Sequence, residues 1–184
     1  MIIASNNKGK IKEIKEIFND MEVKSLKEVG IDIEVEEDAD TFYGNALKKA
    51  KTIYSIAHEP VIADDSGLCI AAYNNWPGVL THRFLGDEAS DEERNETILA
   101  RMNGVENRSA SVICSIVYYD GCKIIEGKGI LEGKITESIR GSNGFGFDSI
   151  FELTTGKTLA ELEPDEKNLI SARYLALIDL KKKL

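Results

Sequence analysis

The chain has 184 residues, of which 42% are hydrophobic and 30% are charged, and its formal net charge is −9. This composition is typical of a globular protein with one substantial core. The negative charge argues against non-specific binding to a nucleic-acid polymer or to an anionic membrane. Cys69, Cys114 and Cys122 lack C-x-x-C spacing, so they indicate neither a disulfide framework nor a zinc site. With no basic-then-apolar leader and no apolar run of membrane-spanning length, we expect a soluble, cytoplasmic protein.

The N-terminal segment predicts a strand, a polar loop and a helix. An apolar run at 1–4 indicates the strand, and S-N-N-K-G-K at 5–10 leads into apolar residues on one helical face. Lys8, Lys10 and Lys12 crowd the helix start, although the helix dipole prefers anions there. Bound phosphate would remove this conflict, because loop N–H groups, the helix end and Lys10 would all point at it. The alternative is a solvated basic first turn, and the loop lacks the Walker A spacing.

An acidic segment precedes a long helix. A short strand is possible at 22–26, and residues 31–40 carry acids that we expect mostly on a solvated face. Apolar residues then recur with helical spacing from about 41 to 57. Asp40 or Thr41 is expected to be the N-cap, and acids before the helix suit its dipole.

The run V-I-A-D-D-S-G-L at 61–68 predicts a buried strand that ends in two acids, Asp64 and Asp65. Ligands of open α/β sheets usually lie at strand ends, and burial raises the pKa of at least one of two neighbouring carboxyls unless a cation intervenes. One interpretation is that both acids handle a divalent metal and a water. The other is a turn in which one of them caps a helix or bonds its own backbone. A separate strand is possible at 67–72.

The second half predicts a helix at about 90–102, a strand at 110–119 and a return strand at 122–132. The helix opens with a capping box of Ser90 and Glu93. An Asp-Gly turn joins the two strands, which is a strong hairpin signal. Gly127 and Gly129 in the return strand predict a bulge or bend. These strands would add an antiparallel portion to the βα units of the first half.

Glycines alternate with aromatic residues in R-G-S-N-G-F-G-F-D-S-I-F at 140–151. The spacing is not G-x-G-x-x-G, so no dinucleotide fold is implied. The glycines could bring the backbone close to a flat base on which Phe145 or Phe147 stacks. The pattern alone favours the other interpretation, a glycine-rich loop that its aromatic residues anchor to the core. Pro164 is expected to start the last helix, which runs to the C-terminal lysines.

Six stretches, in their order and with their gaps, resemble the inosine triphosphate pyrophosphatase family over nearly the whole chain. They are S-N-N-K-G-K at 5–10, T-F-Y-G-N-A-L-K-K-A at 41–50, A-D-D-S-G-L at 63–68, P-G-V at 77–79, G-F-G-F-D at 144–148 and E-K-N-L-I-S-A-R at 166–173. The resemblance implies a two-lobed α/β fold with an elongated mixed β-sheet flanked by helices and a deep central cleft. Residues 1–184 would form one nucleoside-triphosphate pyrophosphatase domain with two lobes around that cleft.

The same resemblance implies a homodimer that hydrolyses ITP, dITP and XTP to the monophosphate and pyrophosphate with Mg²⁺. By motif position, it implies catalytic roles for Asp65, which would accept the proton of the attacking water, and for Asp64 and Lys10. The implied metal ligands are Glu37 and Asp65. Substrate binding is implied for Ser5, Asn6, Asn7, Lys8, Gly9, Lys10, Lys49, Ser66, Phe145, Gly146, Phe147, Asp148, Lys167, Ala172 and Arg173.

The chain departs from the family pattern at Ala172, where the family usually has the histidine of S-H-R. That histidine is expected to help read the 6-keto oxygen of the base, and alanine has no side-chain donor. Losing one hydrogen bond weakens discrimination by about 1–3 kcal/mol, so the departure bears on base selectivity and not on the phosphate chemistry. Phe147, where tyrosine is commoner, changes only a hydroxyl group.

Two alternative functions remain open. The related septum-formation nucleotide pyrophosphatases share the architecture but prefer other bases, and the stretches at 144–148 and 166–173 argue against them. A non-catalytic nucleotide sensor would keep the lysine loop but would not need Glu37, Asp64 and Asp65.

Overall fold

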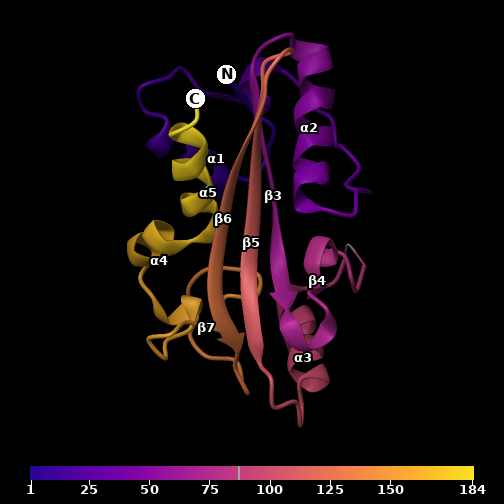
Figure 1. The fold of residues 1–184 in the computed structure, drawn as a ribbon, viewed down its shortest axis with the longest axis vertical. Helices are drawn as coiled ribbons and strands as arrows, with labels where there is room; N and C mark the ends of the chain where they lie inside the picture. The colour runs from indigo at the N-terminus through magenta and orange to yellow at the C-terminus, as the bar shows by residue number, and fades with distance from the viewer. Residues whose placement is uncertain (87) are drawn as a thin grey trace. The chain divides into compact units, whose positions relative to one another are not determined.

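The protein is described by a computed structural model that covers residues 1–86 and 88–184, and this part of the chain forms an α/β fold (Figure 1). Its helices are α1 (Lys8–Ile17), α2 (Phe42–Ala57), α3 (Asp91–Arg101), α4 (Pro164–Ile170) and α5 (Ala172–Lys181). Its strands are β1 (Ile2–Ile3), β2 (Lys24–Ser25), β3 (Val61–Ile70), β4 (Trp76–Pro77), β5 (Ser109–Tyr119), β6 (Ile124–Ile135) and β7 (Phe151–Glu152). Within the described ranges, no helix combines the length and the apolar character needed to cross a membrane.

Contacts divide the chain into two compact units. Unit 1 comprises 1–66, 114–129 and 172–184, and unit 2 comprises 67–113 and 130–171. The long strands β3, β5 and β6 therefore contribute residues to both units. That the whole chain is one catalytic domain with a cleft stays a prediction.

The strands form a mixed sheet with the hydrogen-bonded order β2-β1-β3-β5-β6-β7, and β4 pairs with β3. In unit 1, β1 is parallel to both β2 and β3. In unit 2, β4 is antiparallel to β3 and β7 is antiparallel to β6. The registers are Ile2↔Lys24, Ile2↔Val61, Cys69↔Pro77 and Lys134↔Glu152. The predicted α/β fold with a mixed sheet is confirmed, and so is the hairpin between β5 and β6.

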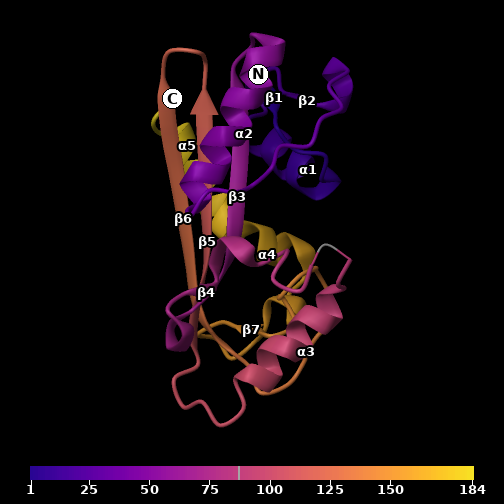
Figure 2. The same ribbon diagram turned by 90° about the vertical axis from the view of Figure 1, so that its right-hand side faces the viewer.

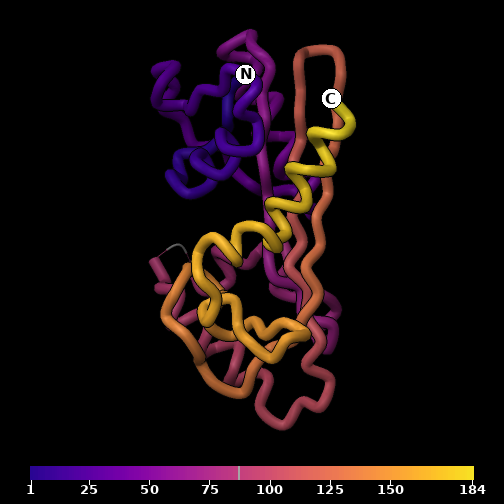
Figure 3. The backbone as a smooth tube through the Cα atoms, turned by 90° about the vertical axis from the view of Figure 1, so that its left-hand side faces the viewer, coloured from indigo at the N-terminus to yellow at the C-terminus, as the bar shows by residue number. Residues whose placement is uncertain are grey.

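In unit 1, helices cover both faces of the strands (Figures 1 and 2). The apolar stripe of α2 packs on one face, because alternate residues of β1 and β3 point toward it. The buried residues of this layer are Ile2, Ala4, Leu26, Ala46, Ala50, Ile53, Val61, Ala63 and Val117. Helix α5 runs along the β5–β6 hairpin (Figure 3) and also contacts α1.

The two glycines of β6 explain how closely α5 approaches the sheet. A Cβ atom on Gly129 would overlap the backbone carbonyl of Ala172, and one on Gly127 would overlap that of Ala176. Strand β6 continues through both positions, and the predicted bulge or bend stays a prediction. The two glycines let a helix backbone lie directly on the strand.

We expect Gly129→Ala to lower the free energy of unfolding by about 2 kcal/mol, because the added methyl group meets backbone that cannot rotate away. Lys128→Ala is the matched control on the same strand, since Lys128 is exposed, and it should change stability by less than about 0.5 kcal/mol. Urea unfolding of both variants measures the difference. Equal stability of the two variants would mean that α5 shifts away at little cost.

Several local predictions are confirmed and two are wrong. Thr41 caps α2, Ser90 and Glu93 form the capping box of α3, and Pro164 begins α4. The strand expected to end at the two acids continues unbroken to Ile70, so the acids lie inside β3 and not at its end. The single last helix is two helices, because Ser171 has an extended backbone (φ −60°, ψ 148°) that ends α4 before α5 begins.

Candidate functional site

The adjacent acids of β3 point to opposite faces of the sheet, because successive side chains of a strand alternate. Asp64 is 2% exposed and lies on the side of α1 and α5, where its Oδ2 is 2.9 Å from Lys10 Nζ and 3.3 Å from Arg173 Nε. Asp65 is 6% exposed and lies on the side of α2, where its Oδ2 accepts a hydrogen bond of 2.9 Å from Asn45 Nδ2. The two carboxylates therefore have different partners and different chemistry.

Asp64 is the centre of a buried ion cluster. Burial alone would raise the pKa of Asp64, but the positive charges of Lys10, Arg173 and Lys49 hold that pKa well below its usual range. Arg173 also forms an ion pair with Glu13, with Nη1 3.3 Å from Oε2. A carboxylate that stays ionised is a weak base, so this arrangement suits Asp64 to hold cations in place and not to accept a proton.

Asp65 has the opposite electrostatics. Burial raises the pKa of Asp65 to about 6, against the opposing effects of Lys49 and the Asn45 hydrogen bond, and the negative charges of Glu37 and Asp64 add to the increase. Its Oδ1 accepts a 2.9 Å hydrogen bond from the Ser66 N–H. A general base works best when its pKa is near the operating pH, so Asp65 has the properties of a proton acceptor.

Glu37 and Lys49 complete the charged group of unit 1. Lys49 Nζ lies 2.5 Å from Glu37 Oε1 and also donates to the backbone carbonyl of Asp64. Burial alone would lower the pKa of Lys49, but the charges of Asp64, Glu37 and Asp65 raise it, so the lysine is a cation.

Helix α2 holds the acidic segment in place. Asn45 Oδ1 accepts a 2.9 Å hydrogen bond from the Ala39 N–H, and Lys48 Nζ is 2.6 Å from Asp38 Oδ1. The acids of residues 31–40 were expected mostly on a solvated face, where they suit the helix dipole. That interpretation is incomplete, since two of these acids pair with lysines of α2. Asn45 was not among the predicted site residues, although Asn45 and Lys49 are four residues apart and therefore share one face of α2.

The donor set fits a metal that shares its coordination with a substrate. No three His, Cys, Asp or Glu residues in the described part of the chain are grouped as a metal cage. Glu37 and Asp65 instead bring two mutually repelling carboxylates into range of each other. Mg²⁺ typically binds one or two carboxylates together with phosphate oxygens, so these two residues suit it.

The loop at the start of α1 is already organised by its own residues. Asn7 is the N-cap, and its Oδ1 accepts hydrogen bonds from the N–H groups of Gly9 (2.9 Å) and Lys10 (3.1 Å). The Asn7 N–H donates to Ser5 Oγ at 3.2 Å. The ion pair with Asp64 gives Lys10 an anionic partner, which removes part of the conflict with the helix dipole. A phosphate-binding role for residues 5–10 stays a prediction.

In unit 2, the glycine–aromatic loop contains a second group of predicted site residues. Asp148 is buried, bonds Lys167 through its Oδ2 and accepts a 2.8 Å hydrogen bond from the Phe145 N–H. Burial raises the pKa of Asp148 although Lys167 opposes the increase. Phe147 packs edge-on against Phe151, as the anchored-loop interpretation predicts, but Phe145 is 56% exposed. The anchored-loop interpretation therefore holds for one of the two aromatic residues.

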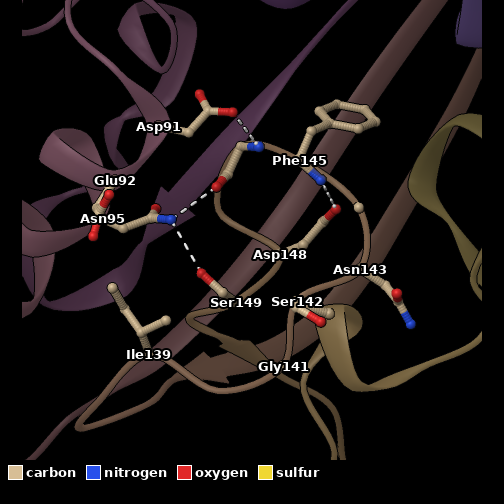
Figure 4. Close-up of a pocket in the computed structure, with 13 residues that line it drawn as sticks. Asp91, Glu92, Asn95, Ile139, Gly141, Ser142, Asn143, Phe145, Asp148 and Ser149 are labelled. Carbon is tan, nitrogen blue, oxygen red and sulfur yellow. Dashed lines mark hydrogen bonds between the residues drawn. The ribbon is translucent and has the colours of Figure 1, made fainter.

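A pocket of about 390 Å³ opens beside this loop (Figure 4). It is lined by Asp91, Glu92, Asn95, Ile139, Gly141, Ser142, Asn143, Gly144, Phe145, Gly146, Asp148, Ser149 and Ala160. Asp91 and Asn95 were not predicted as site residues, since the sequence indicated only a capping box at the start of α3. The available signal was their four-residue spacing, which places both on one helical face.

The predicted site residues thus fall into two groups, one in each unit. Unit 1 holds Ser5, Asn6, Asn7, Lys8, Gly9, Lys10, Glu37, Lys49, Asp64, Asp65, Ser66, Ala172 and Arg173, and unit 2 holds Phe145, Gly146, Phe147, Asp148 and Lys167. Ala172 is only 3% exposed, so it presents little side-chain surface to a ligand.

Comparisons with known proteins agree on one family. The profile of the Ham1 family matches residues 1–183. The dITP/XTP pyrophosphatase of Clostridium tetani is 42% identical over 191 residues, which cover 100% of this chain and 95% of that protein. A HAM1 protein from Coxiella burnetii has a structure that superimposes with a TM-score of 0.93 at 37% identity, over 99% of this chain and 96% of that one. The Ham1 protein of Staphylococcus aureus superimposes with a TM-score of 0.91 at 36% identity, over 100% and 98% of the two chains.

Proposed function

The chain belongs to the Ham1 family, and we propose that it hydrolyses deaminated purine nucleoside triphosphates, namely ITP, dITP and XTP, to the monophosphate and pyrophosphate. The relatives that are named dITP/XTP pyrophosphatases support this substrate class. The observation that supports the chemistry is that Asp64 and Asp65 lie on opposite faces of β3, with Asp64 ionised among cations and Asp65 given a raised pKa that suits a proton acceptor.

The cations of unit 1 match the charge of a triphosphate. Lys10 and Arg173 come from α1 and α5, and Asp64 holds both of them in fixed positions. Lys10 would neutralise charge on the leaving pyrophosphate when the bond between its bridging oxygen and the α-phosphorus breaks. Lys49, which is held by Glu37, would lie near the phosphates.

Asp65 would take the proton of the water that attacks the α-phosphorus. Its Oδ2 is held by Asn45 and its Oδ1 by the Ser66 N–H, so the carboxylate cannot rotate freely. Glu37 and Asp65 would hold Mg²⁺, which when bound supplies positive charge to the phosphate oxygens. Base recognition would come from the loop of Phe145 to Asp148 and from Lys167. Homodimer formation and a cytoplasmic location stay predictions from the sequence.

The experiment that tests this function is pyrophosphate release from ITP, dITP, XTP, ATP and dTTP with Mg²⁺. We expect turnover of the first three substrates and much slower turnover of ATP and dTTP. Because Ala172 lacks a donor for the 6-keto oxygen, preference for ITP over ATP should be about 5- to 150-fold lower than in relatives that carry the histidine. Preference for dTTP would indicate the septum-formation type, and binding without turnover would indicate a sensor. Chelation of the metal with EDTA should abolish release.

A further inference from the structure

Helix α3 holds one residue of the glycine–aromatic loop by both of its backbone groups. The Gly146 N–H donates to Asp91 Oδ2 at 2.7 Å, and the Gly146 carbonyl accepts from Asn95 Nδ2 at 2.8 Å (Figure 4). Asn95 Nδ2 also donates to Ser149 Oγ at 3.2 Å. Asp91 and Asn95 lie one helical turn apart, so a single face of α3 makes all three bonds.

The side-chain amide of Asn95 that donates to Gly146 is buried. Asn95 is only 4% exposed, and a buried amide is costly unless its hydrogen bonds are satisfied. The loop contains Gly144 (φ +83°) and Gly146 (φ +62°), which occupy the left-handed region that only glycine adopts readily, and glycine has several other conformations available to it. The bonds from α3 therefore restrain Gly146, one of the most conformationally adaptable residues of the loop, to one conformation.

The residue next to Gly146 is the exposed Phe145. Its N–H is fixed by Asp148 at 2.8 Å, and Lys167 Nζ lies 4.5 Å from the centroid of its ring. An aromatic ring that is exposed, yet held by backbone and cation contacts, is arranged like the stacking platforms on which proteins bind flat bases. The pocket described above is lined by Phe145 and by the two residues of α3.

We propose that Asp91 and Asn95 are positioning residues that fix Gly146 so that Phe145 presents its ring to the purine base of the substrate. This inference rests on the proposed function. Neither residue takes part in phosphate hydrolysis. Their bonds act on base recognition alone, so their loss raises KM for a nucleotide and leaves hydrolysis of a substrate without a base unchanged.

The test compares Asp91→Ala with Asp91→Asn. Both variants lose the charge at the start of α3 and the ion pair with Arg94, but asparagine keeps an oxygen that accepts from the Gly146 N–H. We expect Asp91→Ala to lower kcat/KM for dITP about tenfold or more, mainly through KM, and Asp91→Asn to stay within about threefold of wild type. Asn95→Leu, which has a similar shape but no donor, should resemble Asp91→Ala.

Pyrophosphate release from ribose 5-triphosphate, which has no base, separates positioning from folding. This rate should be the same in all variants, whereas general destabilisation lowers it together with the dITP rate. An equal loss on both substrates, or equal dITP kinetics for Asp91→Ala and Asp91→Asn, overturns the inference. If Asn95→Leu does not fold, the comparison of Asp91→Ala with Asp91→Asn tests the positioning role without it.

Failure of the proposed function gives a different result. In that case the wild-type protein releases no pyrophosphate from dITP, and equilibrium binding of inosine 5′-monophosphate replaces the kinetic comparison. Weaker binding by Asp91→Ala than by Asp91→Asn then supports the positioning role, and equal binding by the two variants overturns it.

Discussion

Replacing Asp65 by asparagine should lower the rate of pyrophosphate release from dITP by about 10²- to 10⁴-fold, which is the usual contribution of a general base. Asparagine keeps the shape of the side chain but cannot accept the proton of the attacking water. Steady-state assays at saturating dITP and Mg²⁺ measure the loss. A well-folded Asp65→Asn protein with wild-type activity would remove Asp65 from the mechanism.

The same substitution should leave the protein at least as stable at high pH. In the folded protein the pKa of Asp65 is about 6, against an ordinary value of 3.8. The folded state therefore binds the proton more tightly than the unfolded state, and stability falls as the pH rises from about 4 to 6. Above about pH 6 the free energy of unfolding has lost the full contribution of this group, about 3 kcal/mol at most.

Asparagine avoids that loss of stability but has one oxygen for the two donors, Asn45 and the Ser66 N–H, that the carboxylate satisfies. We expect a net gain of about 1 kcal/mol at pH 8 that disappears at pH 4. Urea unfolding at both pH values in EDTA measures it. A loss of stability that is equal at pH 4 and pH 8 would contradict the raised pKa.

Asp64→Asn should act in the opposite direction and lower the free energy of unfolding by about 3–5 kcal/mol near pH 7, because it leaves Lys10 and Arg173 partly buried without their shared anion. The pKa of Asp64 is depressed, so its stabilising effect is present above about pH 4, the ordinary range of a carboxyl group. It is lost as the pH falls through the folded-state value. Urea unfolding near pH 7 measures the effect.

Glu16→Gln is the control for Asp64→Asn, since the Lys12–Glu16 pair is exposed and its atoms are 3.7 Å apart. It should change stability by less than about 0.5 kcal/mol. Asp64→Asn should also retain more kcat than Asp65→Asn, because Asp64 positions cations and does not move a proton. Equal effects of Asp64→Asn and Glu16→Gln on stability would show that the ion cluster adds nothing to the fold.

Local rules predicted the elements whose causes are local. The capping box of Ser90 and Glu93, the Thr41 cap and the hairpin turn depend on residues at most a few positions apart, and all three are confirmed. The same rules failed at β3 and at Ser171. Polar, turn-prone residues continue the buried strand after Asp65, and an ordinary serine interrupts a helical pattern.

The sequence by itself determined the fold class, the family motifs and the identity of the charged residues. The family resemblance implied different roles for Asp64 and Asp65, but two adjacent carboxylates have the same intrinsic chemistry, so the sequence supplied no physical reason for the difference. Only the tertiary structure supplied that reason, since one of the cations beside Asp64 is Arg173, which lies 109 residues along the chain. The contact between Asn95 and Gly146 likewise spans 51 residues. Electrostatic energy depends on distance in space, so contacts between distant segments decide which carboxylate has a lowered pKa and which has a raised pKa.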